Sequence, residues 1–172
     1  MNPQVWQDLK ETLRTVLGES RWEEALGLNP EALSVLIPMA RQLAEQGRLD
    51  EAQALFEGLV VLYPQEAYLH TALGCVYMRK GWTEDAIAAF QCALNRDPAD
   101  VAAHTYLGEL HLARGEVEAA LRHLAQAVGL DSTGTDPYAN RARLLSGLVA
   151  VLARTGVDGT STDKPETDAF LS

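Results

Sequence analysis

The chain has 172 residues and a formal net charge of −10, with 47% hydrophobic and 22% charged residues. This length and composition are typical of a globular domain with a real core. The acidic balance argues against a nucleic acid or an anionic membrane surface as partner, because both attract basic patches. Good helix formers dominate the middle of the chain and no stretch alternates as a half-buried strand would, so the sequence predicts an all-α fold.

The N-terminal segment, residues 1–32, carries two helix-start signals. Asn2 is suited to cap a first helix that ends at Gly18. Ser20 and Glu23 have the spacing of a capping box, which predicts a short second helix. A basic region followed by an apolar run, as in a signal peptide, is not visible at the start, and the longest apolar run is too short to span a bilayer.

Three segments then align without a gap over a period of 34 residues: 33–66, 67–100 and 101–134. Each contains a helix, a glycine turn and a second helix, and a fixed period of this length indicates a repeat architecture. A helix is expected to begin at Pro30, and Pro38 predicts either a kink in it or a new start. The turns fall at the equivalent glycines Gly47, Gly81 and Gly115.

Two equivalent glycines, Gly74 and Gly108, lie inside the first helices of their segments, where each costs about 1 kcal/mol relative to Ala. We expect this cost to be offset by close packing, with Gly74 facing Ala86 and Gly108 facing Ala120. Bulky residues such as Tyr77 and Phe90 would then fill the space where the two axes diverge. A role in the core is far more plausible for these glycines than contact with a ligand.

The repeated pattern resembles the tetratricopeptide repeat over residues 33–134. This resemblance implies a right-handed superhelix of three helical hairpins. Three positions depart from the consensus: Ala40 replaces Gly, Leu59 replaces Ala, and Ser132 replaces Pro. The middle segment carries the signature residues Leu73, Gly74, Tyr77, Ala86, Phe90, Ala93 and Pro98.

The chain after the third segment is predicted to form one more helix over 135–154, with Asp136 and Pro137 at its start. A stack of hairpins leaves its last face bare, so this helix is expected to cap the stack. Residues 155–172 are polar and rich in Gly, Ser, Thr and Pro, and we expect a disordered tail. The apolar stripe of the capping helix comprises Tyr138, Ala142, Leu145, Leu148, Val149 and Leu152.

The search for catalytic or metal chemistry finds little. His104 and His111 share one helix at a spacing too long for one tetrahedral ion. Cys75 and Cys92 form no C-x-x-C motif, and no phosphate loop, nucleophile elbow or dinucleotide fingerprint is present. We therefore expect neither an enzyme nor a cofactor or metal site. Two cysteines are not a disulfide framework, and they suit a reducing cytoplasm.

The repeat resemblance implies a concave groove lined by the first helices, which holds another polypeptide. The mixed floor suits an extended peptide with spaced apolar anchors better than a charged one. An alternative for Tyr68 and Tyr106 is that they only pack between repeats. The candidate groove residues are Ile37, Arg41, Tyr68, Thr71, Cys75, Met78, Arg79, Tyr106, Glu109 and Leu112.

Repeats that bind the acidic C-termini of heat-shock chaperones use a clamp of Lys, Asn and Arg in this groove. Only one of the corresponding positions is basic here, so the resemblance does not favour a heat-shock co-chaperone. Those positions are Ile37, Arg41, Ala72, Ala102 and Tyr106.

The stretch "AEQGRLDEAQALFEGLVVLYPQEAYLHTALGCVYMRKGWTEDAIAAF" is similar to the class II translocator chaperones of bacterial type III secretion. That resemblance implies a cytoplasmic chaperone that holds an extended apolar segment of a secreted translocator. A general scaffold or adaptor in a pilus or envelope assembly complex remains the alternative. Trp6 and Trp22 of the N-terminal helices either form a homodimer interface, as in relatives, or cap the repeat core. Phe170 raises the further alternative that the chain's own tail fills the groove.

Overall fold

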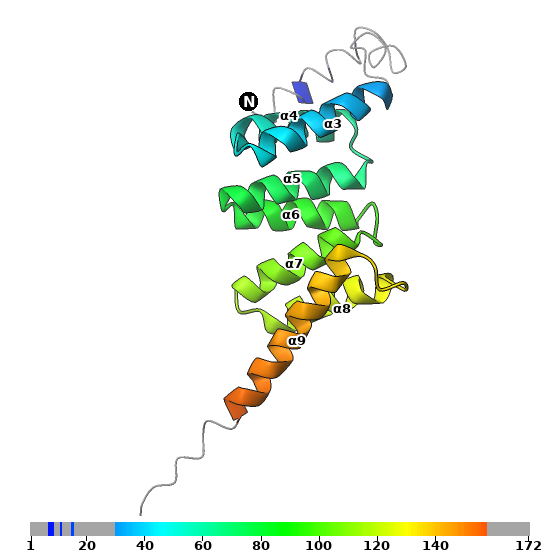
Figure 1. Cartoon of the computed structure of the whole chain (residues 1–172). Coiled ribbons are helices and arrows are strands. Elements are labelled where there is room, and N and C mark those ends of the chain that lie inside the picture. The colour runs from blue at the N-terminus through cyan, green and yellow to red at the C-terminus, as the bar shows by residue number, and fades with distance from the viewer. Residues whose placement is uncertain (1–6, 9–10, 12–14, 16–29, 158–172) are drawn as a thin grey trace, which may run out of the picture.

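The computed structural model describes residues 7–8, 11, 15 and 30–157, and this region forms a stack of helical hairpins followed by one long helix (Figure 1). Each hairpin packs against the next, and α9 packs on both helices of the last hairpin. The all-α prediction is confirmed, since every regular element in the described part is a helix. The helices are α3 (Pro30–Glu45), α4 (Leu49–Leu62), α5 (Ala67–Lys80), α6 (Thr83–Leu94), α7 (Val101–Ala113), α8 (Val117–Leu130) and α9 (Pro137–Val157).

The turn inside each hairpin is made by a glycine in the left-handed region. Gly47, Gly81 and Gly115 have φ values of 80°, 75° and 74°. L-residues with a side chain rarely adopt this conformation, whereas glycine does so at little steric cost. The predicted turn positions are therefore confirmed, and each second helix starts immediately after its turn.

The repeat positions chosen from the sequence form the core. The equivalent alanines Ala52, Ala86 and Ala120 have no exposed surface. The next shared position, four residues later, is also fully or almost fully buried in Phe56, Phe90 and Leu124. Apolar side chains from consecutive hairpins meet in this way along the whole stack, so the core is a continuous column rather than one central cluster.

The partner of the helical glycines differs from the prediction. A Cβ at Gly74 would lie 2.7 Å from Phe90 Cε1, and a Cβ at Gly108 would lie 2.5 Å from Leu124 Cδ2. Phe90 therefore packs onto the glycine instead of filling a wider space, while the backbone oxygen of Ala120 lies 3.4 Å from a Cβ at Gly108, as expected for helices that approach there. The large residue of the second helix needs the space that a side chain at Gly74 would occupy.

Pro38 does not end a helix. It lies inside α3, which runs without interruption from Pro30 to Glu45. The prediction of a new helix start at Pro38 is wrong, although the residue lacks the N–H of one backbone hydrogen bond. The turn that follows contains the fully buried Ala40, which packs in the same cluster as Ala52 and Phe56 of α4. This tertiary packing holds the helix together across the proline.

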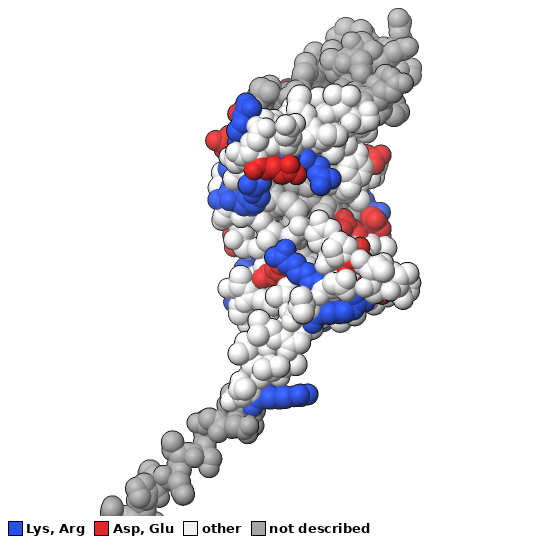
Figure 2. Space-filling model, viewed as in Figure 1, with Lys and Arg blue, Asp and Glu red and all other residues white. Residues whose placement is uncertain are grey.

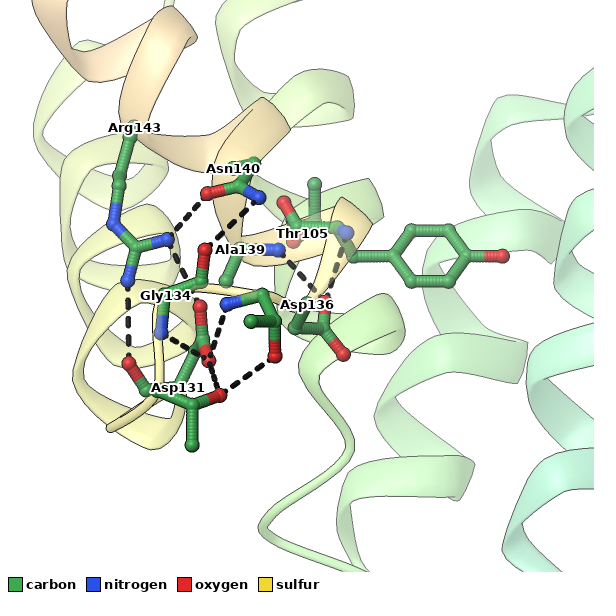
Figure 3. A network of polar contacts seen from close by, with 10 residues as sticks. Thr105, Asp131, Gly134, Asp136, Ala139, Asn140 and Arg143 are labelled. Carbon is green, nitrogen blue, oxygen red and sulfur yellow. Dashed lines mark hydrogen bonds and ion pairs between the residues drawn. The ribbon is translucent and has the colours of Figure 1, made fainter.

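The connection from α8 to α9 is fixed by a network of polar contacts (Figure 3). Asp131 Oδ1 accepts the backbone N–H of Gly134 at 2.9 Å, and Asp131 Oδ2 pairs with Arg143 Nη1 at 2.9 Å. Asp136 caps α9, because its Oδ1 accepts the N–H of Ala139 at 3.0 Å. The angle at which α9 leaves the stack is thus set by side chains from both ends of this linker.

The capping helix covers less of the stack than the sequence predicts. Its first half packs through the fully buried Ala139 and Ala142, but Leu148 and Leu152 of the predicted stripe are exposed. The helix continues beyond Arg154 to Val157 and projects past α8 (Figure 1). Within the described residues, no helix combines the length and the apolar character that a bilayer-crossing segment needs. The predictions for the N-terminal helices, for Trp6 and Trp22, and for residues 158–172 concern residues outside the described part of the chain.

Candidate functional site

A cavity of about 510 Å³ lies on the side of the stack formed by the first helices. Helices α3, α5 and α7 follow one another along this side, and the start of α9 closes one end (Figure 1). Because these helices sit at equivalent positions of successive hairpins, the cavity is a direct product of the repeat. It is lined by Ile37, Arg41, Ala44, Glu45, Phe56, Tyr68, Thr71, Ala72, Cys75, Val76, Arg79, Asp100, Ala102, Tyr106 and Tyr138.

The structure brings seven of the ten candidate groove residues together around this cavity, and they come from three different helices. Tyr68 is 43% exposed at its edge, so its ring is accessible to a bound chain. Ala72 and Ala102 contribute small side chains between the larger ones, which leaves room on the floor. The seven residues are Ile37, Arg41, Tyr68, Thr71, Cys75, Arg79 and Tyr106.

The other three candidates do not line the cavity. Met78 packs against the buried cluster formed by α6 and α7. Glu109 forms an ion pair with Arg141 of α9, and Leu112 packs against the cluster shared by α8 and α9. Helix α9 therefore lies over the C-terminal half of α7, and the open groove extends over α3, α5 and the first half of α7.

The floor of the cavity is held by a bridge between repeats. Thr71 Oγ1 donates to Asp100 Oδ2 at 2.5 Å, while Asp100 Oδ1 accepts the N–H of Ala103 at 2.9 Å. Asp100 thus caps α7 and ties it to α5 at the same time. At the equivalent position of the next repeat, Thr105 Oγ1 donates to the carbonyl oxygen of Tyr138 at 3.2 Å. The hydroxyl of Thr71 consequently positions helices.

Burial determines the protonation state of the two ionisable groups at the centre of the cavity. It raises the pKa of the Cys75 thiol to about 11, against an opposing hydrogen bond with Tyr106. It also raises the pKa of the Tyr106 hydroxyl, so both groups are neutral at physiological pH. Tyr106 stacks on Phe90 at a centroid distance of 5.2 Å and meets Tyr138 edge-on at 5.6 Å. This part of the wall is an uncharged, rigid aromatic surface.

Charged groups lie at the rim of the cavity. Arg79 donates to the carbonyl oxygen of Ala44 and so links α5 to the end of α3. Arg41 and Glu45 of α3 add one charge of each sign. On the face shown in Figure 2, acidic and basic residues are interspersed and form no large patch of one sign. An apolar centre with a mixed rim favours spaced hydrophobic anchors over a highly charged ligand.

The sequence reasoning missed several lining residues, of which Tyr138 and Asp100 matter most. Asp100 precedes α7 at an N-cap position, and that signal was available in the sequence. Tyr138 was harder to find, because α8 is two residues longer than α6 and thereby shifts the repeat register at the start of α9.

Two histidines at equivalent repeat positions hydrogen-bond to the backbone. His70 Nε2 donates to the carbonyl oxygen of Pro64 at 3.3 Å, and His104 Nε2 donates to that of Pro98 at 3.2 Å. These are the same contact at equivalent positions, so they are part of the repeat. In the described part of the chain, no three His, Cys, Asp or Glu residues are arranged to hold a metal ion.

Comparison with known families identifies the repeats. Two family models, both described as tetratricopeptide repeat, match residues 71–137 and residues 33–57. The two segments together cover more than half of the chain. No curated protein sequence matches the chain at a significant level.

Solved structures share the fold over most of the chain. PcrH in complex with the chaperone-binding region of PopD is 25% identical, with a TM-score of 0.66, over 75% of this chain and 97% of that one. The type III secretion chaperone SycD of Yersinia enterocolitica, bound to a peptide of the translocator YopD, is 21% identical, with a TM-score of 0.66, over 74% and 98%. The Sgt2 repeat domain of Aspergillus fumigatus is 16% identical, with a TM-score of 0.69, over 82% and 93%.

Proposed function

Because this chain is a tetratricopeptide-repeat protein, we propose that it is a secretion chaperone that holds an extended apolar segment of a translocator-type cargo in its groove. The cavity between α3, α5 and α7 carries this proposal, since it offers apolar and aromatic side chains to a chain lying across three repeats. PcrH and SycD have the same fold; PcrH is described in complex with the chaperone-binding region of PopD, and SycD with a peptide of the translocator YopD. Sgt2 shares the fold as well, so the support comes from the cavity together with these chaperones.

The cavity suits an anchor-by-anchor mode of binding. Ala72 and Ala102 contribute small side chains to the lining that also contains Tyr68 and Tyr106, and the Cys75 thiol in this lining is neutral. A bound apolar side chain would be removed from water there without leaving a charge unpaired. The polar rim would keep the cargo's flanking residues solvated. Such a site retains an aggregation-prone segment and requires no chemical step.

The alternative is a scaffold that joins two soluble proteins of an assembly complex, and the same groove could serve it. The two functions differ in the partner rather than in the fold. The chaperone proposal also places the chain in the cytoplasm, where the free thiols of Cys75 and Cys92 would stay reduced.

Capture of the partner tests the proposal. The full chain, as bait in the cells that produce it, should retain a secreted protein with long apolar segments, identified by mass spectrometry. The variant Tyr68→Glu should lose at least about 90% of this protein, because a charge at the edge of an apolar site must be desolvated when the cargo binds. Val117→Glu is the matched control, since Val117 is also 43% exposed but lies on α8, away from the cavity.

Two results would contradict this function. Recovery of soluble assembly proteins alone would support the scaffold instead. Equal recovery of the cargo by Tyr68→Glu and by the wild-type chain would show that the cargo binds elsewhere.

A further inference from the structure

Helix α9 has the register of the first helix of a fourth repeat. Asp100 caps α7 by accepting the N–H of Ala103, and Asp136 caps α9 by accepting the N–H of Ala139 in the same way. Ala103 and Ala139 are both fully buried. Counting from these equivalent residues places Leu144 of α9 at the position of a helical glycine of the repeats. That position is where a first helix contacts the second helix of its own hairpin.

The face of α9 that should pack on such a second helix is exposed. Gly108 of α7 contacts Leu124 of α8, whereas Leu144 at the corresponding position is 75% exposed. Leu148, one turn further, is 55% exposed, and Val151 is 54% exposed. These three residues follow one another at helical spacing and form one stripe, which we call the α9 stripe.

The surroundings of the α9 stripe are uncharged. Between Arg143 and Arg154, ten consecutive residues carry no charge, and the side facing away from the stack is as apolar as the packed side. Figure 2 shows this end of the molecule as largely uncharged atoms that end at one basic residue. A helix that is apolar on all sides is normally buried on all sides. The stripe therefore requires an occupant.

The course of α9 argues against a hairpin within the same chain. After α7 the chain reverses direction at Gly115, and the residue of α9 at the corresponding position is Val151. The helix continues through Val151 to Val157, so the chain does not return at the position where a regular second helix begins. An intramolecular helix in the usual repeat geometry would have no turn from which to start.

We propose that the occupant is the α9 stripe of a second copy of this chain, packed antiparallel. Helical spacing makes the stripe self-complementary: a pairing that puts Leu148 opposite Val151 of the second copy also puts Leu152 opposite Gly147. Gly147 meets nothing within 4 Å in its own chain, which leaves room for a leucine.

The charge distribution also favours dimerisation through α9. Two chains of net charge −10 repel each other, and α9 contains no acidic residue. Its arginines near the stack are neutralised locally, Arg141 by Glu109 and Arg143 by Asp131. Two copies can therefore approach through α9 without bringing like charges into contact at the stripe.

Sedimentation equilibrium of the full chain tests the pairing. The interface is small, so we expect a reversible dimer with a dissociation constant on the order of 10 μM. Leu148→Glu should raise this constant at least about tenfold, because it introduces a charge into the paired stripe. Val35→Glu, at a comparably exposed apolar residue of α3, should leave it unchanged. Circular dichroism verifies that each variant keeps its helix content.

A charge pair tests the register. In an equimolar mixture of Leu148→Glu and Val151→Lys chains, heterodimers should form, because the glutamate of one copy faces the lysine of the other. A wild-type chain that is monomeric at all concentrations would overturn the proposal. If Phe170→Asp then made it dimerise, residues 158–172 would be the occupant instead. A dimer that persists in Leu148→Glu would also overturn it, since the copies would then meet through another surface.

Discussion

At the scale of single residues, Gly74 sets how closely α5 and α6 approach. The ring of the fully buried Phe90 lies where a Cβ of residue 74 would be, and Gly108 and Leu124 repeat this contact in the next hairpin. The sequence showed that these glycines are internal to helices and periodic. It did not show which side chain uses the space, because that depends on the angle at which the two helices cross.

We predict that Gly74→Ala lowers the free energy of unfolding. The new Cβ would overlap the Phe90 ring, at a cost of about 1–3 kcal/mol, which exceeds the gain of about 1 kcal/mol in helix propensity. Urea unfolding followed by circular dichroism measures the difference. Gly129→Ala in α8 is the control, because a Cβ there meets nothing within 4 Å.

The double variant Gly74→Ala, Phe90→Ala separates overlap from other effects. Phe90→Ala removes the ring that a Cβ at residue 74 would overlap, so Gly74→Ala should cost less in this background. If the two substitutions were strictly additive, the contact between these positions would not be the cause of the loss.

At the scale of elements, three histidine rings join α7 to α8. His104 Nδ1 and His123 Nδ1 are 3.1 Å apart, and the rings of His111 and His123 stack at a centroid distance of 5.5 Å. His111 Nδ1 also donates to Glu116 at 2.6 Å. Burial, together with the neighbouring His104, His111 and Arg122, lowers the pKa of His123 to about 4.

This lowered pKa predicts a loss of stability in acid. His123 has a pKa of about 6.5 in the unfolded chain and about 4 in the folded chain. Between these values the unfolded chain binds more protons, so the free energy of unfolding decreases as the pH is lowered from 6.5 to 4. The ring is only half buried, and with solvent screening we expect a decrease of about 1–2 kcal/mol. Urea unfolding at several pH values should show a smaller decrease for His123→Gln. Parallel curves for the two proteins from pH 7 to 4.5 would contradict this assignment.

At the scale of the whole molecule, the cavity exists only because several hairpins stack and α9 closes one end. The reactivity of Cys75 is a measure of this arrangement, since residues from three helices surround the side chain and bury its thiol. A change in how the hairpins stack would alter the exposure of Cys75 even if every helix remained intact.

We predict that Cys75 alkylates slowly. With a pKa of about 11, the thiolate fraction at pH 8 is about 100-fold lower than for a thiol at the ordinary value of 9.0, and the thiolate is the reactive form. The rate with iodoacetamide, followed by mass spectrometry on the Cys92→Ser variant, should still rise at pH 10. A rate that levels off by about pH 10, as for a thiol of ordinary pKa, would show that Cys75 is more exposed than the stacked structure allows.

The sequence by itself determined the repeats, their glycine turns and the residues of the core. These features depend on local conformation and on contacts between neighbouring hairpins, which recur at a fixed spacing and can therefore be read along the chain. The same spacing placed Tyr68, Cys75 and Tyr106 on the first helices, which is why the cavity's central residues were among the candidates.

Only the tertiary structure decided how much of the groove is open and which faces remain uncovered. Helix α9 starts in a shifted register because α8 is two residues longer than α6; it lies over Glu109 and Leu112 and leaves Leu144 exposed. Likewise, packing against α4 carries α3 through Pro38, where local propensity alone favours a break. These outcomes depend on the angles and positions at which distant helices meet, and a one-dimensional pattern does not contain that information.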